Sequence, residues 1–292
     1  MTQTLRIGLV GAGLMGHGIA RNLLRAGYPL TILEHPGNQP VDDLVKAGAQ
    51  LASTGREVAE AADAVLLCVT GSPQVEAALF EPGGVLEGMA QGGVVIDCST
   101  ALPSSTARVA ARVVEAGGHF MDAAMTRTPR EAEEGRLNLI VGAPPALFSK
   151  MRPLLESFAE NITHAGDVGA GHTLKLLHNF VSLGFSAVLA EATAASRRAE
   201  IDGSAFLEVV GKGGGGGVVF DRLRPFIAED DPSGFRFSVA NASKDLGYYH
   251  AMTDELGAGR RVAEAVEALY AGIDDQNLTV PEIIRILEGD KA

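Results

Sequence analysis

Apolar and polar residues follow two different patterns along this chain, and the first occupies its N-terminal half. Short apolar runs bounded by glycine or polar residues indicate buried strands, and apolar residues that recur every three or four positions indicate helices. The runs predict strands at 6–10, 30–34, 64–69, 94–98, 119–124, 137–141 and 162–165. Helices are predicted between them, at 41–47, 57–61 and 145–159, and beginning at 74 and 104. Strands that alternate with helices indicate a doubly wound, mostly parallel sheet, which binds ligands at the carboxyl ends of its strands.

The pattern changes near residue 166, where strand-like runs end. A helical pattern extends without interruption from about 170 to 199, and shorter helices are predicted at 204–210, 221–226, 239–256, 260–271 and 280–287. We therefore predict an α/β domain at 1–165 and an all-α domain at 166–292, joined by the long helix. Apolar residues circle that helix, which indicates burial on several sides and contact with a second subunit.

A glycine-rich turn, Gly-Ala-Gly-Leu-Met-Gly, follows the first predicted strand and opens the first helix. Gly11 allows the sharp turn, Gly13 lets a pyrophosphate approach the backbone, and Gly16 lets the helix pack on the strand. The helix N-terminus, with Leu14 and Met15, would point free N–H groups at the phosphates. An ordinary glycine-rich loop is the alternative, but strand, turn and helix in this order indicate a Rossmann dinucleotide-binding domain.

An acidic residue closes the second predicted strand. Glu34 lies about 20 residues after the glycine-rich turn, where a carboxylate accepts hydrogen bonds from ribose hydroxyls and repels a 2′-phosphate. The next residues, His35 and Pro36, offer no lysine or arginine for an extra phosphate. We predict NAD(H) as cofactor, with use of NADP(H) left open. Val69 ends the strand predicted at 64–69 and Thr70 follows it, at the same sheet edge as the glycine-rich turn, so both residues are predicted to border the cofactor.

Composition and charge restrict the possible partners. The 292 residues are 46% hydrophobic and 21% charged, as in ordinary globular proteins. The net charge of −12 argues against a nucleic-acid partner, because no basic stripe is available to neutralise phosphates. An anionic substrate would therefore need a locally basic site.

The two cysteines, Cys68 and Cys98, lie near the ends of apolar runs, with a spacing that matches no metal motif. We expect buried free thiols and no metal site. The first strand begins close to the N-terminus and no apolar run looks long enough to cross a bilayer, so we expect no signal peptide, no membrane partner and a cytoplasmic protein.

A second group of polar residues lies at the start of the long helix. Lys175 and Asn179 are four residues apart and share one helix face. Gly169 and Gly171 precede them and would let another backbone or a ligand come close. A lysine in a closed cleft can protonate the oxyanion formed when a carbonyl accepts hydride, and take the proton back in the reverse reaction. The alternative is a lysine that faces water with a solvated asparagine, as is common on helices.

Four motifs occur together in this chain: the glycine-rich turn with its methionine, Asp-x-Ser-Thr-x-x-Pro at 97–103, Gly-x-Gly-x-x-x-Lys-x-x-x-Asn at 169–179, and Lys-Asp-Leu at 244–246. In this order and spacing they resemble the β-hydroxyacid dehydrogenase family, which includes 3-hydroxyisobutyrate dehydrogenases and tartronate semialdehyde reductases. The resemblance covers nearly the whole chain. It implies a C-terminal domain like that of 6-phosphogluconate dehydrogenase, and a homodimer or homotetramer built on that domain.

The resemblance also implies a reaction, a hydride transfer between NAD(H) and a small β-hydroxy acid or the corresponding aldehyde acid. Lys175 would be the general acid/base, with Asn179 holding the substrate oxygen or the lysine. Ser99 and Thr100 would bind the acid group of a small anionic substrate, with Thr100 also close to the cofactor. Lys244 would close the site near substrate and nicotinamide. His172 and His178 receive no catalytic role and are interpreted as polar residues of the helix.

One segment departs from the family pattern. The family usually carries a Ser-Gly-Gly turn after the strand at 119–124, whereas this chain has Thr126, Arg127 and Thr128. This is similar to the sulfolactaldehyde reductase branch. Our hypothesis is that Arg127 makes a bidentate contact with a second or bulkier anionic group. A surface arginine on a mobile loop is the alternative.

Two other functions share parts of these signals. An imine reductase has the same two-domain plan but usually lacks a lysine at the position of Lys175. A non-catalytic NAD(P)-sensing protein would need none of Lys175, Asn179 and Lys244. A decarboxylating sugar-phosphate dehydrogenase would have a longer helical domain.

Overall fold

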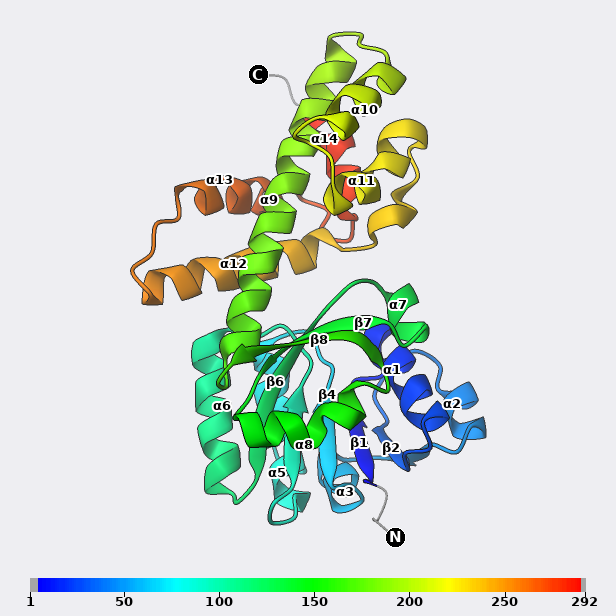
Figure 1. Ribbon diagram of the computed structural model, residues 1–292, viewed down its shortest axis with the longest axis vertical. Helices are drawn as coiled ribbons and strands as arrows, with labels where there is room; N and C mark the ends of the chain where they lie inside the picture. The colour runs from blue at the N-terminus through cyan, green and yellow to red at the C-terminus, as the bar shows by residue number, and fades with distance from the viewer. Residues whose placement is uncertain (1–4, 290–292) are drawn as a thin grey trace. The chain divides into compact units, whose positions relative to one another are not determined.

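The computed structural model describes residues 5–289, which belong to two compact units (Figure 1). The first unit ends at Lys175 and the second begins at Leu176, so the division falls inside the long helix α9 (Ala170–Arg198). The domain boundary expected from the sequence, between residues 165 and 166, lies before this helix, and it stays a prediction.

An eight-stranded sheet forms the centre of the first unit, in the order β3-β2-β1-β4-β5-β6-β7-β8. The strands are β1 (Ile7–Val10), β2 (Leu30–Leu33), β3 (Gln50–Ala52), β4 (Ala64–Leu67), β5 (Val94–Asp97), β6 (His119–Thr126), β7 (Leu137–Gly142) and β8 (Ala159–Gly166). All neighbours pair in parallel except β6 and β7. The doubly wound, mostly parallel sheet is therefore confirmed. Strand β3 was not predicted, because its short segment is largely exposed and contains no apolar run.

Helices cover both faces of this sheet, which explains why β1, β4 and β5 are buried along their whole length. One apolar core involves α1 (Leu14–Arg25), α2 (Asp42–Lys46), α7 (Pro129–Glu133) and α8 (Pro145–Leu155). The opposite core involves α3 (Gly55–Glu60), α4 (Ser72–Phe80), α5 (Val85–Gly88) and α6 (Pro103–Glu115). Figure 1 shows α8 crossing the sheet on the side that faces the viewer.

The second unit is helical in its described part, as predicted. It contains the rest of α9, α10 (Gly203–Lys212), α11 (Val218–Glu229), α12 (Val239–Glu255), α13 (Arg261–Ala271), α14 (Ile283–Gly289) and the 3-10 turns η1 (Pro232–Phe235) and η2 (Val280–Glu282). Leu183 and Ala190 of α9 pack with Leu223, Phe226 and Tyr270 in one apolar core. This packing accounts for the apolar positions that recur at helical spacing in the sequence.

Helix α9 corrects one expectation. By length and composition alone, its 29 residues are sufficient to cross a membrane. No apolar run long enough to do so was expected from the sequence. Small residues such as alanine and glycine interrupt the run of large apolar side chains without lowering its mean hydropathy much. Leu183, Ala187 and Ala190 of α9 are buried in the helical core, and core helices can pass the same test of length and composition.

Candidate active site and cofactor site

The glycine-rich turn has the geometry that its sequence requires. Gly11 has a φ of +98°, and a Cβ there would lie 2.3 Å from the carbonyl oxygen of Cys68. A Cβ on Gly16 would lie 1.9 Å from the carbonyl oxygen of Gly11. At Gly13, by contrast, a Cβ would have no atom within 4 Å apart from those of the adjoining residues. Gly11 and Gly16 are therefore required by the fold itself, whereas Gly13 leaves open space against which a phosphate can lie.

The N-terminus of α1 offers unused backbone donors next to this space. Gly13 is the N-cap residue, and no side chain of the described chain caps the helix, which is the arrangement of an anion site. Asn38, which sequence reasoning missed, braces the turn by accepting the Ala12 N–H at 3.0 Å and donating to the Leu33 carbonyl at 2.8 Å. Glu34 is exposed directly after β2. These features fit the pyrophosphate and ribose of a dinucleotide.

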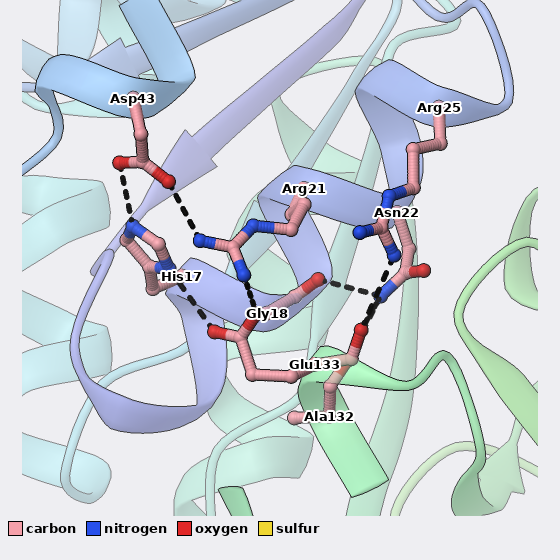
Figure 2. A network of polar contacts seen from close by, with 8 residues as sticks. All are labelled: His17, Gly18, Arg21, Asn22, Arg25, Asp43, Ala132 and Glu133. Atoms are coloured by element: carbon pink, nitrogen blue, oxygen red, sulfur yellow. Dashed lines mark hydrogen bonds and ion pairs between the residues drawn. The ribbon is translucent and has the colours of Figure 1, made fainter. Parts of the chain in front are cut away.

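A polar network joins α1 to α2 and α7 (Figure 2). The two ring nitrogens of His17 each lie 3.1 Å from a carboxylate oxygen, one of Asp43 and one of Glu133. Arg21 pairs with the same two carboxylates, at 2.7 Å from Asp43. Its hydrogen bond lowers the pKa of Asp43 to about 2, with His17 contributing in the same direction. The Asn22 amide donates to the Ala132 carbonyl at 2.9 Å. The helix at the cofactor turn is thereby tied to the helices on either side.

The loops after β4 and β5 are linked at the carboxyl edge of the sheet. Asp97, buried at the end of β5, accepts the Ser99 N–H on Oδ1 at 2.9 Å. The Ser99 hydroxyl oxygen accepts the Val69 N–H at 3.1 Å. A hydroxyl that accepts a hydrogen bond keeps its own hydrogen for donation. The structure thus brings together Val69 and Ser99, which is followed by the half-buried Thr100. Val69 was expected at the cofactor, Ser99 at the substrate and Thr100 at both.

Asp122 anchors the start of α9. Its buried carboxylate, at β6, accepts the N–H groups of Gly169 at 2.7 Å and His172 at 2.8 Å. A Cβ on Gly171 would lie 2.5 Å from the Ile140 carbonyl oxygen and 2.6 Å from Asp122. The group that comes close to Gly171, as expected from the sequence, is therefore another part of the protein's own chain. No role was assigned to Asp122 from the sequence, although an acidic residue inside an apolar strand indicates a buried carboxylate.

Lys175 and Asn179 lie further along α9, and both are buried, with 8% and 7% of their surface exposed. The alternative of a lysine facing water is therefore wrong. The Asn179 amide donates to the Asp245 carboxylate at 2.5 Å, and Asn179 Oδ1 lies 3.0 Å from His178 Nδ1. Asp245 is a further residue that sequence reasoning missed, and its signal was the Lys-Asp-Leu motif. Its carboxylate also lies 3.0 Å from Nζ of the neighbouring Lys244.

Arg127 lies in a different environment from the one expected. Its guanidinium pairs with the Glu160 carboxylate and donates to the Arg136 carbonyl. Its φ of +81° is in the left-handed region that glycine tolerates best, which agrees with the glycine that the family usually has in this turn. The arginine is thus not a loose surface side chain. A role in binding an anionic group stays a prediction, for which Glu160 competes.

The cysteines have the environment of inert thiols. Both cysteines are free, and Cys98 is buried as expected whereas Cys68 is half-buried. Desolvation raises the pKa of the Cys68 thiol to about 12 and that of Cys98 well above its usual value. Between residues 5 and 289, no cluster of three or more histidine, cysteine, aspartate or glutamate side chains is arranged to hold a metal ion.

Two family models match the chain in the order of its two halves. Residues 6–166 match the NAD-binding domain of 6-phosphogluconate dehydrogenase, and residues 169–283 match the NAD-binding domain of NADP-dependent 3-hydroxyisobutyrate dehydrogenase. A 2-(hydroxymethyl)glutarate dehydrogenase from Eubacterium barkeri is 33% identical over 85% of this chain and 82% of its own length. Together these matches cover nearly every described element.

Solved structures give the same result with one contrast. A 3-hydroxyisobutyrate dehydrogenase from Salmonella typhimurium has a TM-score of 0.84 at 27% identity, over 97% of this chain and 99% of its own. An imine reductase from Myxococcus stipitatus has a TM-score of 0.63 at 22% identity, over 98% and 99%. At that identity the imine reductase shares the fold alone. The resemblance drawn from the four motifs is confirmed, and the chain is an NAD-binding oxidoreductase that belongs to the β-hydroxyacid dehydrogenase family.

Proposed function

We propose that this protein transfers a hydride between NAD(H) and a small β-hydroxy acid or the corresponding aldehyde acid, with Lys175 as general acid/base. The observation that carries the proposal is the burial of Lys175 on a helix whose first turn is held by Asp122 at the sheet. A buried lysine on a rigid element is suited to proton transfer at one defined atom. The family to which the chain belongs supplies the reaction class.

The cofactor would be held by residues of the first unit. The backbone around Gly11, Gly13 and Gly16, with Leu14 and Met15, would bind the pyrophosphate at the N-terminus of α1. Glu34 would accept hydrogen bonds from the adenosine ribose, and Val69, Thr70, Thr100 and Lys244 would border the rest of the molecule. When bound, NAD(H) supplies the hydride chemistry.

The protein's own groups would handle the proton and the acid group. In reduction, Lys175 Nζ donates a proton to the substrate oxygen as negative charge develops on it, and in oxidation it takes that proton back. Asn179, whose amide is oriented by Asp245, would hold the same oxygen or the lysine. Ser99 and Thr100 would donate to the acid group, and Lys244 would supply the local positive charge that a protein of net charge −12 needs. Arg127 would bind a second anionic group only by leaving Glu160.

Steady-state kinetics test this proposal. Reduction of succinic, methylmalonic and tartronic semialdehydes and of sulfolactaldehyde would be followed by the absorbance of NADH and, separately, of NADPH. We expect turnover of at least one aldehyde acid, and a kcat/KM higher by about tenfold or more with NADH, a difference of about 1.4 kcal/mol, because Glu34 repels a 2′-phosphate. A tenfold preference for NADPH would contradict the role of Glu34. Tight NADH binding without any turnover would favour an imine reductase or a sensing protein.

We also infer that a second copy of the chain covers the outer face of α9 in a cytoplasmic homodimer or homotetramer. Leu177, Val181 and Val188 follow helical spacing, and Val181 and Val188 are 67% and 63% exposed. None of the residues of α10 is buried, although the helix is apolar. Exposed apolar stripes of this kind mark protein interfaces. Sedimentation equilibrium is expected to give at least twice the chain mass of 30.3 kDa, and a Val181→Glu variant to shift toward the monomer. A monomeric wild type would contradict the inference.

A further inference from the structure

Two buried polar groups lie behind the Ser99 loop, and each is incompletely paired. The side chains of Asp97 on β5 and His172 on α9 are 1% and 0% exposed. Asp97 Oδ2 and His172 Nε2 lie 3.9 Å apart, and neither atom has a hydrogen-bond partner in the described part of the chain. Buried polar atoms are nearly always satisfied, so this pair requires an explanation.

The remaining atoms of both side chains are engaged. Asp97 Oδ1 accepts the Ser99 N–H at 2.9 Å. His172 Nδ1 lies 2.7 Å from the Thr106 hydroxyl oxygen, which itself lies 3.2 Å from the Leu102 carbonyl oxygen. The four groups Thr106, His172, Asp97 and Ser99 therefore form one chain, and its only open link is the gap between Nε2 and Oδ2.

The positions of the hydrogens on Thr106 and His172 determine whether a donor and an acceptor face each other across this gap. If the Thr106 hydroxyl donates to His172 Nδ1, the neutral ring carries its hydrogen on Nε2, directed at Asp97. If the hydroxyl donates to the Leu102 carbonyl instead, Nδ1 carries the hydrogen, and two lone pairs would face each other unless a further proton binds Nε2 or Oδ2. In both arrangements one proton on Nε2 or Oδ2 places a donor opposite an acceptor, and the 3.9 Å gap needs to close by only about 0.7 Å for a hydrogen bond to form.

We propose that Asp97 and His172 are positioning residues that share one buried proton and so fix the Ser99 loop to the first turn of α9. The inference rests on the proposed function, because Ser99 and Lys175 are the residues whose separation it sets. His172 lies three residues before Lys175 on the same helix, and its backbone N–H is held by Asp122. Ser99 is held between Asp97 and Val69. The pair is therefore a side-chain connection between the predicted acid-binding loop and the lysine helix.

The surroundings keep the proton in place. Burial raises the pKa of Asp97, and the neighbouring His172 opposes that shift. The other titratable side chains that face the pair are Asp122, which raises the pKa of Asp97 further, and the thiols of Cys68 and Cys98. Because this pocket is closed to water, exchange of the shared proton needs a local opening of the loop.

Nitrogen-15 NMR of histidine-labelled holoenzyme tests the shared proton without relying on activity. The His172 resonances are assigned by their loss in His172→Gln, and the ring is expected to carry a nitrogen-bound hydrogen that exchanges slowly with water, because the pair is buried. The exposed His119 serves as the internal reference and should exchange its ring hydrogen rapidly. A His172 ring hydrogen that exchanges as fast as that of His119 would overturn the proposal.

Kinetics test the positioning role. We expect His172→Ala to lower kcat/KM for the aldehyde acid by about 10- to 100-fold, the scale of a small misplacement of reacting groups, with NADH affinity unchanged. His172→Gln, whose amide can donate to Asp97, should recover most of the loss, and His119→Ala should have no effect. Thr106→Val removes the hydroxyl at the outer end of this series of polar groups with little change in side-chain shape. It should reduce kcat/KM less than His172→Ala does, and it tests the positioning role if His172→Ala does not fold.

The outcomes are separable. If His172→Ala and Thr106→Val are folded and both have wild-type kcat/KM, or if His172→Gln restores nothing, the pair has no positioning role. If the wild-type protein reduces none of the aldehyde acids, the proposed function fails, whereas the NMR experiment still decides whether Asp97 and His172 share a proton.

Discussion

Replacing Lys175 by alanine is expected to lower kcat for reduction of an aldehyde acid by about 10²- to 10⁴-fold, the range that general acid–base catalysis supplies. Without Nζ, the oxygen that gains negative charge would have no proton donor on this face of α9. Water would replace it poorly as a proton donor, because only 8% of the surface of Lys175 is exposed. Stopped-flow measurement of NADH oxidation under single-turnover conditions would report the chemical step directly.

The dissociation constant for NADH should change much less than kcat in this variant, since the predicted pyrophosphate site is at α1 and not at Lys175. Lys150→Ala is the matched control, because Lys150 is an exposed helical lysine of the same unit and should have wild-type kinetics. A kcat for Lys175→Ala within a few-fold of the wild-type value would show that the proton comes from another group. Lys244 would then be the next candidate.

Valine at Gly13 and valine at Gly16 are expected to fail for different reasons. Gly13 has a φ of −74°, and its built Cβ meets no atom of the described chain, so Gly13→Val should fold with a Tm close to that of the wild type. Its side chain would fill the space in front of the N-terminal amides of α1. Each lost charge-assisted hydrogen bond costs about 1.5–3 kcal/mol, so NADH affinity should fall by about 100-fold or more.

Gly16→Val should instead destabilise the fold. Its Cβ would lie 1.9 Å from the carbonyl oxygen of Gly11, and backbone cannot move aside as a flexible side chain can. Overpacking of this kind costs about 1–3 kcal/mol or more, which thermal unfolding without cofactor would detect. Gly203→Val is the matched control, because Gly203 is the first residue of α10, its φ is outside the left-handed region and the space around it is open. Gly27 is not suitable, because its φ is positive. NADH binding by Gly13→Val at wild-type affinity would exclude this turn as the phosphate site.

Much of the architecture was visible in the sequence because it depends on local chemistry. Buried parallel strands require continuous apolar runs, and amphipathic helices require apolar residues at every third or fourth position. The strands from β4 to β8 and the long helix α9 were therefore predicted close to their observed positions. The glycine-rich turn was recognisable for a related reason, since backbone geometry at Gly11 and contact at Gly16 exclude other residues.

Short elements and individual contacts were not predictable in this way. Strand β3 has exposed side chains, and α7 is a single short turn of helix, so neither leaves a periodic pattern. The hypothesis that Arg127 binds an anionic group stays a prediction, whereas its pairing with Glu160 on β8, 33 residues away, was not foreseen. No local signal indicates which of several carboxylates a guanidinium will meet, because that depends on how β6, β7 and β8 are aligned.

The sequence alone therefore determined the fold class and the cofactor turn, through residues whose spacing is set by one turn or one helix, and the resemblance of its motifs to a known family singled out Lys175 as the candidate proton donor. The tertiary structure alone decided what surrounds them. The Asp122 carboxylate at the start of α9, the His17 network between α1, α2 and α7, and the Asp97–His172 pair each join segments that are distant in sequence. Such contacts form only when the strands pair and the helices pack. Their strength depends on how deeply the polar groups are buried, and a local sequence pattern does not reveal that burial.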